Sequence, residues 1–131
     1  VRIMVDARKI GGGDNNFFGV ICRYQDTDNF YSAVINSAGE FAILERLAGV
    51  GLEVISGDQF THSVVVNPQM ELNLLEVSCK GNQITLMVNG VLLAEATQDS
   101  LLTGDVGLIA GTFSSNSSDV LFDNFTLYLE E

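Results

Sequence analysis

The sequence is poor in several residue types on which common functions depend. It contains no tryptophan, one proline (Pro68), one histidine (His62) and two cysteines in 131 residues. One histidine and two distant cysteines cannot supply the four ligands of a zinc site. No G-x-S-x-G elbow marks a serine hydrolase, and a histidine set among valines is typical of a structural strand position. The lack of tryptophan also removes the flat ring that sugar-binding surfaces favour.

Positive charge is scarce as well. Six Lys and Arg face seventeen Asp and Glu, which gives a formal net charge of −11. Such a chain repels phosphate backbones and anionic lipid, so nucleic acid is not an expected partner. No apolar run approaches the ~20 residues that span a bilayer, and we expect no membrane insertion. An acidic, lysine-poor chain favours an extracellular, periplasmic or cell-surface location.

The residues that are present alternate in the manner of strands. Residues 17–46 form three strand-like runs joined by polar turns, which predicts an antiparallel meander. In the first run one face holds large or apolar residues and is expected to face the core: Phe18, Val20, Cys22 and Tyr24. The other face is expected to lie on the outside, with glycine leaving a hollow: Gly19, Ile21 and Arg23.

Two hairpin signals follow further along the chain. Gly81-Asn82 and Asn89-Gly90 each separate two alternating runs, and Asn-Gly favours a type I′ turn. Ile84, Leu86 and Val88 are expected to face the core. Residues 98–104 are expected to hold at most one helical turn. About eleven short strands without a long helical pattern predict an all-β, two-sheet antiparallel sandwich. The length indicates one domain over residues 1–131, and the start at Val1 suggests a fragment of a larger protein.

Four segments carry a resemblance to a known family: FGVICRYQDTDNFY, NLLEVSCKGNQITLMVNG, GDVGLIAGT and VLFDNFTLY. In this order they resemble bacterial concanavalin A-like (laminin G-like) jelly-roll domains, and in particular the 3-keto-disaccharide hydrolase family. The resemblance implies a concanavalin A-like jelly roll. In that family a strand usually precedes the position of Val1, so we expect an open sheet edge that could support self-association.

The cysteines allow two interpretations. Cys22 and Cys79 each lie in a strand beside apolar residues. One disulfide bond would fit an oxidising location. Free cysteine is also among the most buried residue types, and a domain of this size does not need a crosslink. We therefore expect two buried thiols.

Acidic residues give few leads to catalysis or metal binding. No pair of carboxylates has strand spacing suited to a retaining glycosidase, although a pair from different strands stays open. Asp26, Asp28 and Asn29 are interpreted as a polar turn. Asp123 lies between two aromatic residues and resembles the position of a structural calcium ion in jelly-roll carbohydrate-binding domains. The alternative is a carboxylate that faces solvent, and no cofactor is required.

Three functions remain, in order of preference. The first is a non-catalytic recognition module, carbohydrate-binding, with Arg23, Tyr31 and Arg46 as ligand-binding residues. An arginine beside a hollow can donate two hydrogen bonds to a hydroxyl-rich or carboxylate ligand. In the alternative, Arg23 pairs with an acidic neighbour on the sheet surface. The second function is a structural or protein-interaction domain of a surface protein, and the third is a sugar hydrolase, which the family resemblance implies.

Overall fold

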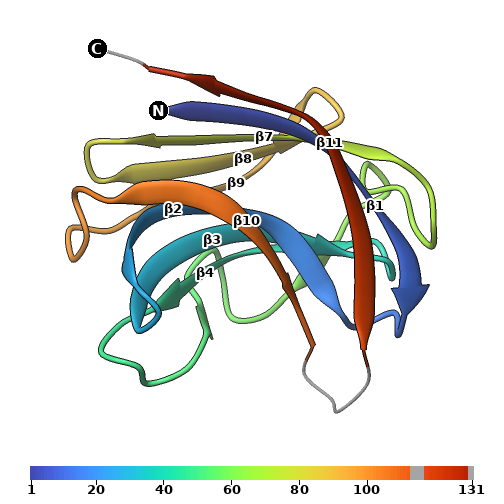
Figure 1. The fold of residues 1–131 in the computed structure, drawn as a ribbon, viewed down its shortest axis with the longest axis horizontal. Helices are drawn as coiled ribbons and strands as arrows, with labels where there is room; N and C mark the ends of the chain where they lie inside the picture. Colours follow the sequence, from blue (N-terminus) through green and yellow to red (C-terminus); the bar gives the residue numbers. More distant parts are fainter. Residues whose placement is uncertain (113–116, 130–131) are drawn as a thin grey trace.

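The computed structural model describes residues 1–112 and 117–129, and in these residues every regular element is a β-strand. Figure 1 shows the strands as arrows coloured along the chain. Their bounds are β1 Arg2–Gly12, β2 Phe17–Asp26, β3 Asn29–Asn36, β4 Glu40–Arg46, β5 Glu53–Val54, β6 Thr61–His62, β7 Asn73–Lys80, β8 Gln83–Val88, β9 Val91–Thr97, β10 Asp105–Gly111 and β11 Ser118–Tyr128. The described residues contain no helix long and apolar enough to cross a membrane.

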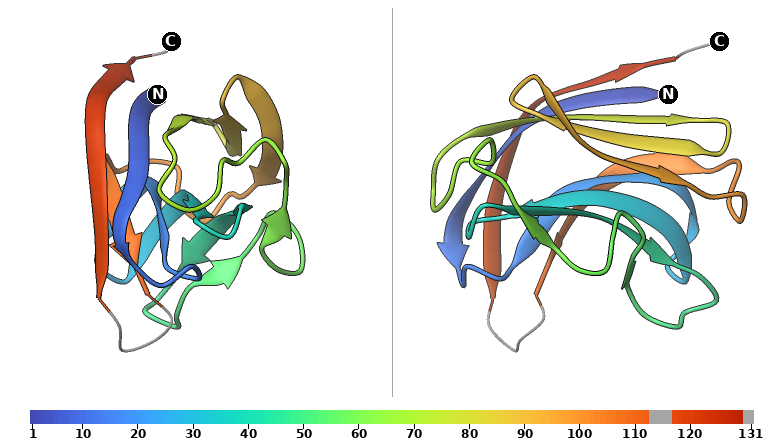
Figure 2. Two further views of the ribbon diagram at one scale, coloured as in Figure 1. Left: turned by 90° about the vertical axis from the view of Figure 1, so that its right-hand side faces the viewer. Right: turned by 180° about the vertical axis from the view of Figure 1, so that it is seen from behind.

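The strands form two antiparallel sheets that pack face to face (Figures 1 and 2). The five-stranded sheet has the order β11-β1-β7-β8-β9. The six-stranded sheet follows β10-β2-β3-β4-β5, and β6 also pairs with β4. Strands β10 and β11 therefore form edges of opposite sheets. The predicted all-β, two-sheet sandwich is confirmed.

The main core lies between the sheets and takes alternate residues from each strand. Phe18, Val20 and Cys22 of β2 are at most 1% exposed, as predicted from the alternation. Leu86 and Val88 of β8 face them from the other sheet and are fully buried. Burial of side chains of this size stabilises the fold by about 1.5–3 kcal/mol each. The period of two therefore identifies the core face of these strands correctly.

The alternation fails at the end of β2, where Arg23 has a positive φ of 55°. On the neighbouring strand Gly107 pairs with Ile21 and Asp105 pairs with Tyr24, so β2 has one extra residue between them. This β-bulge returns Tyr24 to the outer face and turns Arg23 toward the opposite sheet. The predicted positions of Arg23 outside and Tyr24 inside are both wrong, because one left-handed residue shifts the alternation.

The two cysteines form a disulfide bond, so the prediction of free thiols is wrong. Cys22 of β2 and Cys79 of β7 are bonded, with their Cα atoms 6.6 Å apart. Both side chains face the core, and their strands belong to opposite sheets. The packing of the sheets brings the two sulfur atoms together, and the bond crosslinks the sandwich.

The loops agree with the sequence in part. Asn89 and Gly90 have φ values of 51° and 85°, and the predicted type I′ turn is confirmed. The other hairpin has a positive φ at Gly81 alone, which is typical of a type II′ turn. Residues 98–104, for which the sequence allowed one helical turn, form no regular element. The Leu101 backbone N–H instead donates to the Tyr31 hydroxyl over 2.9 Å, which attaches this segment to the core.

Candidate functional site

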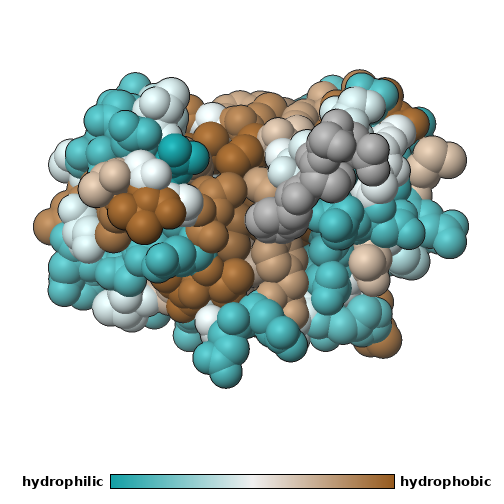
Figure 3. All heavy atoms as spheres, turned by 90° about the horizontal axis from the view of Figure 1, so that it is seen from below, coloured by the Kyte–Doolittle hydropathy of each residue, from teal (hydrophilic) through white to brown (hydrophobic). Residues whose placement is uncertain are grey.

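A groove of about 620 Å³ lies on the outer face of the six-stranded sheet. Figure 3 shows hydrophobic residues gathered along a hollow on this side of the molecule. The volume falls in the range of roughly 300–1,000 Å³ that is usual for small-molecule sites. The groove is lined by Phe17, Tyr24, Thr27, Phe30, Arg46, Leu52, Ile109, Ala110, Gly111 and Thr112.

The floor of the groove is a second small core. Outward-facing residues of β2, β3 and β4 pack together there and are nearly fully buried: Phe17, Val34, Ala42 and Leu44. The segment after β4 adds Leu52, and β10 adds Ile109, both partly buried against this cluster. Gly111 makes a close approach possible, since a Cβ at this position would lie 2.3 Å from the Phe17 ring. The sheet therefore carries an apolar surface on its outer face as well as on its inner face.

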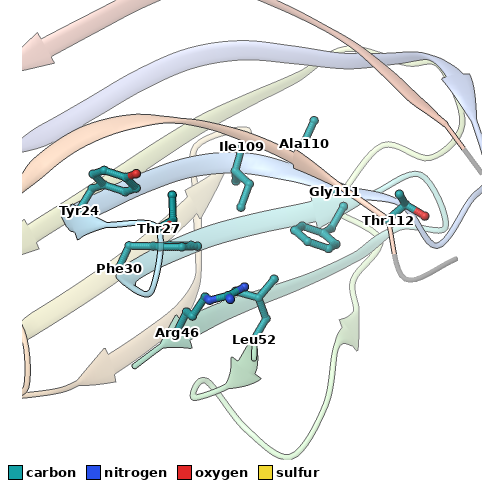
Figure 4. Close-up of a pocket in the computed structure, with 10 residues that line it drawn as sticks. Tyr24, Thr27, Phe30, Arg46, Leu52, Ile109, Ala110, Gly111 and Thr112 are labelled. Atoms are coloured by element: carbon teal, nitrogen blue, oxygen red, sulfur yellow. The ribbon is translucent and has the colours of Figure 1, made fainter. Parts of the chain in front are cut away.

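One end of the groove is polar and aromatic (Figure 4). The rings of Tyr24 and Phe30 lie there with their centroids 5.9 Å apart. Phe30 faces Arg46 across the β3–β4 ladder, and Thr27 lies in the turn between β2 and β3. The β-bulge at Arg23 is what gives Tyr24 its place in this group.

Arg46 is the charged residue of the groove lining. Its side chain is 34% exposed, and its Nη2 lies 3.5 Å from Oδ1 of Asp28. Asp28 is largely exposed, and an ion pair of this kind contributes little in water. The Nε of Arg46 is buried and has no hydrogen-bond partner. Because Nε is covered, the donors that a ligand in the groove could reach are those of the two Nη atoms.

A buried hydroxyl lies on the same face as Arg46. Ser32 of β3 faces Ile21 and Leu44 on the two neighbouring strands and is 1% exposed. Its Oγ has no hydrogen-bond partner. A buried hydroxyl without a partner lowers stability. Because it is covered, this hydroxyl lies below the groove surface.

Of the three residues predicted to bind a ligand, the structure places Arg46 in the groove and the other two elsewhere. Arg23 donates to the backbone carbonyls of Leu102, Cys79 and Gly81. Gly19 leaves no hollow beside it, because a Cβ there would lie 2.1 Å from the Ala33 carbonyl oxygen. Arg23 thus joins the two sheets, and a ligand role for it stays a prediction without support from its position.

Tyr31 lies in the main core and is 1% exposed. Its hydroxyl accepts the Leu101 N–H, and burial is the main cause that raises the pKa of this phenol. The neighbouring charge of Glu45 acts in the same direction. The Tyr31 side chain points away from the groove, so Tyr24 is the tyrosine that could contact a ligand there.

Asp123 lies on the exposed edge strand β11. Its Oδ1 accepts the Asn124 backbone N–H over 2.8 Å, and Asn124 donates from Nδ2 to Oδ2 of Asp6 over 2.7 Å. In the described residues no group of three or more His, Cys, Asp or Glu is placed to hold a metal ion. Calcium at Asp123 stays a prediction.

No model of a protein family and no curated protein matches the sequence. The resemblance to the 3-keto-disaccharide hydrolases is thus without a match. Solved structures do match.

The carbohydrate binding module CBM66 from Bacillus subtilis has a TM-score of 0.73 at 16% identity, over 95% of this chain and 71% of that chain. Sheep galectin-11, in a complex with glycerol, has a TM-score of 0.65 at 13% identity, over 95% of this chain and 87% of that chain. A tetrameric galectin from the ball sponge Cinachyrella sp. has a TM-score of 0.64 at 12% identity, over 98% of this chain and 91% of that chain. Identities this low show the fold alone. The chain has the jelly-roll sandwich fold that these proteins share.

Proposed function

We propose that this chain is a non-catalytic carbohydrate-binding module and that the outer groove of the six-stranded sheet is its binding site. The observation that carries the proposal is the polar end of the groove, where Tyr24 and Arg46 lie on either side of Phe30 and Thr27 lies in the adjoining turn. The structural neighbours support it, since their names include a carbohydrate binding module and galectins.

The chemistry of this end suits a sugar. The guanidinium of Arg46 offers several donors, and the hydroxyls of Tyr24 and Thr27 can donate or accept. The tyrosine ring has an apolar body with a polar tip, which matches the C–H face and the hydroxyl rim of a pyranose. Hydroxyl-rich ligands thus find both kinds of contact within one group of residues.

The test is a glycan array followed by calorimetric titration of the best glycan. We expect Arg46→Ala and Tyr24→Ala each to weaken binding about tenfold or more, because each loses a hydrogen bond or a ring contact. Arg8→Ala is the matched control, since Arg8 is exposed on β1 of the other sheet and its loss changes the charge equally. A glycan whose affinity is unaltered by both groove variants would overturn the assignment, as would an array on which the folded wild-type protein retains no glycan.

Sugar hydrolysis is an alternative that would need additional groups. The ten residues that line the groove include no Asp or Glu. A retaining glycosidase uses two carboxylates about 5 Å apart. We therefore make binding the proposal, and release of reducing sugar from an array-positive glycan is the measurement that would favour hydrolysis.

A protein-interaction role is favoured by a separate observation at the open side of the sandwich. Leu127 of β11 faces the core residue Ile3 across the ladder, and Leu108 of β10 faces the core residue Val20. Both leucines are nevertheless about 40% exposed, at 42% and 38%. Self-association through this edge, as expected from the sequence, stays a prediction that sedimentation velocity over a concentration series would test.

We also propose an extracellular, periplasmic or cell-surface location. The disulfide bond between Cys22 and Cys79 supports it, since such bonds persist in oxidising compartments. Fractionation of the source cells, with detection of the protein, would test this.

A further inference from the structure

The lining of the groove changes character along its length. Tyr24, Thr27 and Arg46 lie at one end, near the turn between β2 and β3 (Figure 4). Beyond Arg46 the groove has apolar side chains, Leu52 next to β4 and Ile109 on β10, before Thr112 at its far end (Figure 4). A sugar ring placed against Arg46 would leave the apolar part of the groove, between Leu52 and Ile109, without a ligand group in contact with it.

The apolar length is built into the fold. Phe17 is 3% exposed and forms its floor, and Leu52 and Ile109 pack against the same buried cluster. Gly111 keeps this floor accessible from the β10 side, where any larger residue would collide with the Phe17 ring. Several strands thus contribute to a preformed apolar surface, and transfer of an apolar group onto it from water is favourable.

Charge complementarity fixes the orientation of an amphipathic ligand. Among the described residues that line the groove Arg46 is the one cation, and its partly exposed guanidinium makes a 3.5 Å ion pair with the exposed Asp28. A hydroxyl-bearing or acidic group is therefore best placed at the Arg46 end. The opposite orientation would set an apolar group against a guanidinium and polar groups against Leu52 and Ile109, which costs free energy.

We propose that the groove binds a saccharide that carries an apolar substituent, such as an acyl ester or an alkyl or aryl aglycone. The sugar lies at the Arg46 end, and the substituent lies between Leu52 and Ile109 above Phe17. This inference rests on the proposed function, since it names the class of saccharide for the same site.

The test uses probes with one sugar and increasing chain length. Methyl, butyl and hexyl β-D-glucopyranosides and the corresponding galactopyranosides are titrated calorimetrically, with hexanol as the probe that lacks a sugar. We expect affinity to rise about threefold to fourfold per added methylene, the factor that corresponds to burial of one CH₂ group. Hexanol should bind more weakly than the better of the two hexyl glycosides.

Two variants locate the substituent. Leu52→Ser should lower the ratio of hexyl to methyl affinity, since it removes one apolar wall of the groove. Val50→Ser is the matched control in the same loop, because Val50 is 75% exposed and does not line the groove. It should leave the ratio unaltered. Circular dichroism spectra of both variants should match the wild type.

The outcomes separate the two proposals. Glycosides that bind with an affinity independent of chain length would overturn this inference and leave the proposed function standing. Hexanol that binds as tightly as both hexyl glycosides would show that the sugar contributes nothing, which would overturn the proposed function. If none of the glycosides binds, this inference is wrong, and the glycan array then decides the proposed function separately.

Discussion

Arg23 holds the two sheets together at the point where β2 leaves its regular pleat. Its guanidinium donates to a carbonyl of the segment before β10, to one at the end of β7 and to one in the turn after β7. The side chain points inward because the backbone of Arg23 has a positive φ. A residue in the left-handed region costs free energy, and the three hydrogen bonds offset that cost.

Arg23→Ala should therefore lower the free energy of unfolding by about 2 kcal/mol, the usual contribution of hydrogen bonds from a charged donor. Binding to glycans should not change, because Arg23 does not line the groove. Urea denaturation and titration of the array-positive glycan measure the two effects. A loss of binding without loss of stability would return Arg23 to the ligand site that its sequence position suggested.

Glu45 makes stability depend on pH. It faces Glu53 across the β4–β5 ladder, and burial followed by the charge of Glu53 raises the pKa of its carboxyl above 4.5. A carboxyl with a raised pKa binds its proton more tightly in the folded state. The destabilising effect of Glu45 on the free energy of unfolding is thus absent below pH 4.5. It grows as the pH rises from there through the pKa of the folded state.

Glu45→Gln should stabilise the protein at pH 7 and reduce this loss of stability between about pH 4.5 and the folded pKa. Thermal unfolding at several pH values measures the effect. Glu95→Gln is the control, because Glu95 is an exposed carboxylate on β9. Equal stabilisation by both variants would mean that the net charge of −11, rather than the Glu45–Glu53 contact, is responsible.

At the scale of the strand pair, the hairpin between β8 and β9 depends on the backbone conformation of its turn. Gly90 has a φ of 85°, and a Cβ at this position would meet no atom within 4 Å. Any effect of a side chain there must come from the backbone alone. Valine resists positive φ because its branched Cβ crowds the neighbouring carbonyl groups.

Gly90→Val should lower the free energy of unfolding by about 1–2 kcal/mol, the cost of a left-handed conformation for a residue with a Cβ. Gly57→Val is the control, since Gly57 also has open space around it but lacks a positive φ. Thermal unfolding of the two variants gives the comparison. Equal melting temperatures for both variants would show that the turn tolerates a branched residue.

The sequence predicts which residues face the core wherever the period of two is unbroken along a strand. The alternation of Phe18, Val20 and Cys22 identifies a core face, because a sheet with two unlike sides requires a period of two. The same rule fails from Arg23 onward, where the bulge adds one residue. Nothing in RYQD marks a left-handed arginine, since glycine, asparagine or aspartate usually takes that conformation. The inward direction of Arg23 follows from the structure, in which its side chain donates to the carbonyl groups of Leu102, Cys79 and Gly81.

On the scale of the whole molecule, the disulfide bond is the covalent link between the sheets. It joins residues 57 positions apart in sequence. A crosslink that closes a loop of this length restricts the unfolded chain, which stabilises the folded state by roughly 4 kcal/mol in the chain-entropy treatment. The bond lies inside the core, so substitution by small residues also leaves unfilled space.

The double variant Cys22→Ala, Cys79→Ala should therefore lose at least ~4 kcal/mol of unfolding free energy. Guanidinium denaturation with and without a reductant measures the same quantity in the wild type. A thiol titration of the unfolded, unreduced protein should count no free thiol. Two free thiols would restore the interpretation of both cysteines as buried hydrophobic residues.

The candidate site was only partly predictable, because its lining residues come together only in the folded molecule. The sequence suggested Arg46 only as a companion of Arg23 on the outer face, and Arg23 itself turns toward the other sheet. Phe17, Leu52 and Ile109 come from three separate segments and form a surface only after the sheet has folded. The disulfide bond has the same origin, because Cys22 and Cys79 face each other only across the packed sandwich.

The pairing of the first strand with the last has a mechanical consequence. Arg2 lies opposite Tyr128, so the start of β1 and the end of β11 lie side by side (Figure 1). Tension applied between these two points breaks the hydrogen bonds of the β1–β11 ladder one after another, beginning at the Arg2–Tyr128 pair. The tension cannot reach the residues between Cys22 and Cys79, which the covalent bond shields. A single molecule stretched under oxidising conditions therefore extends by roughly 200 Å less than the same molecule after reduction, given the reach of an extended chain and the 57 positions enclosed.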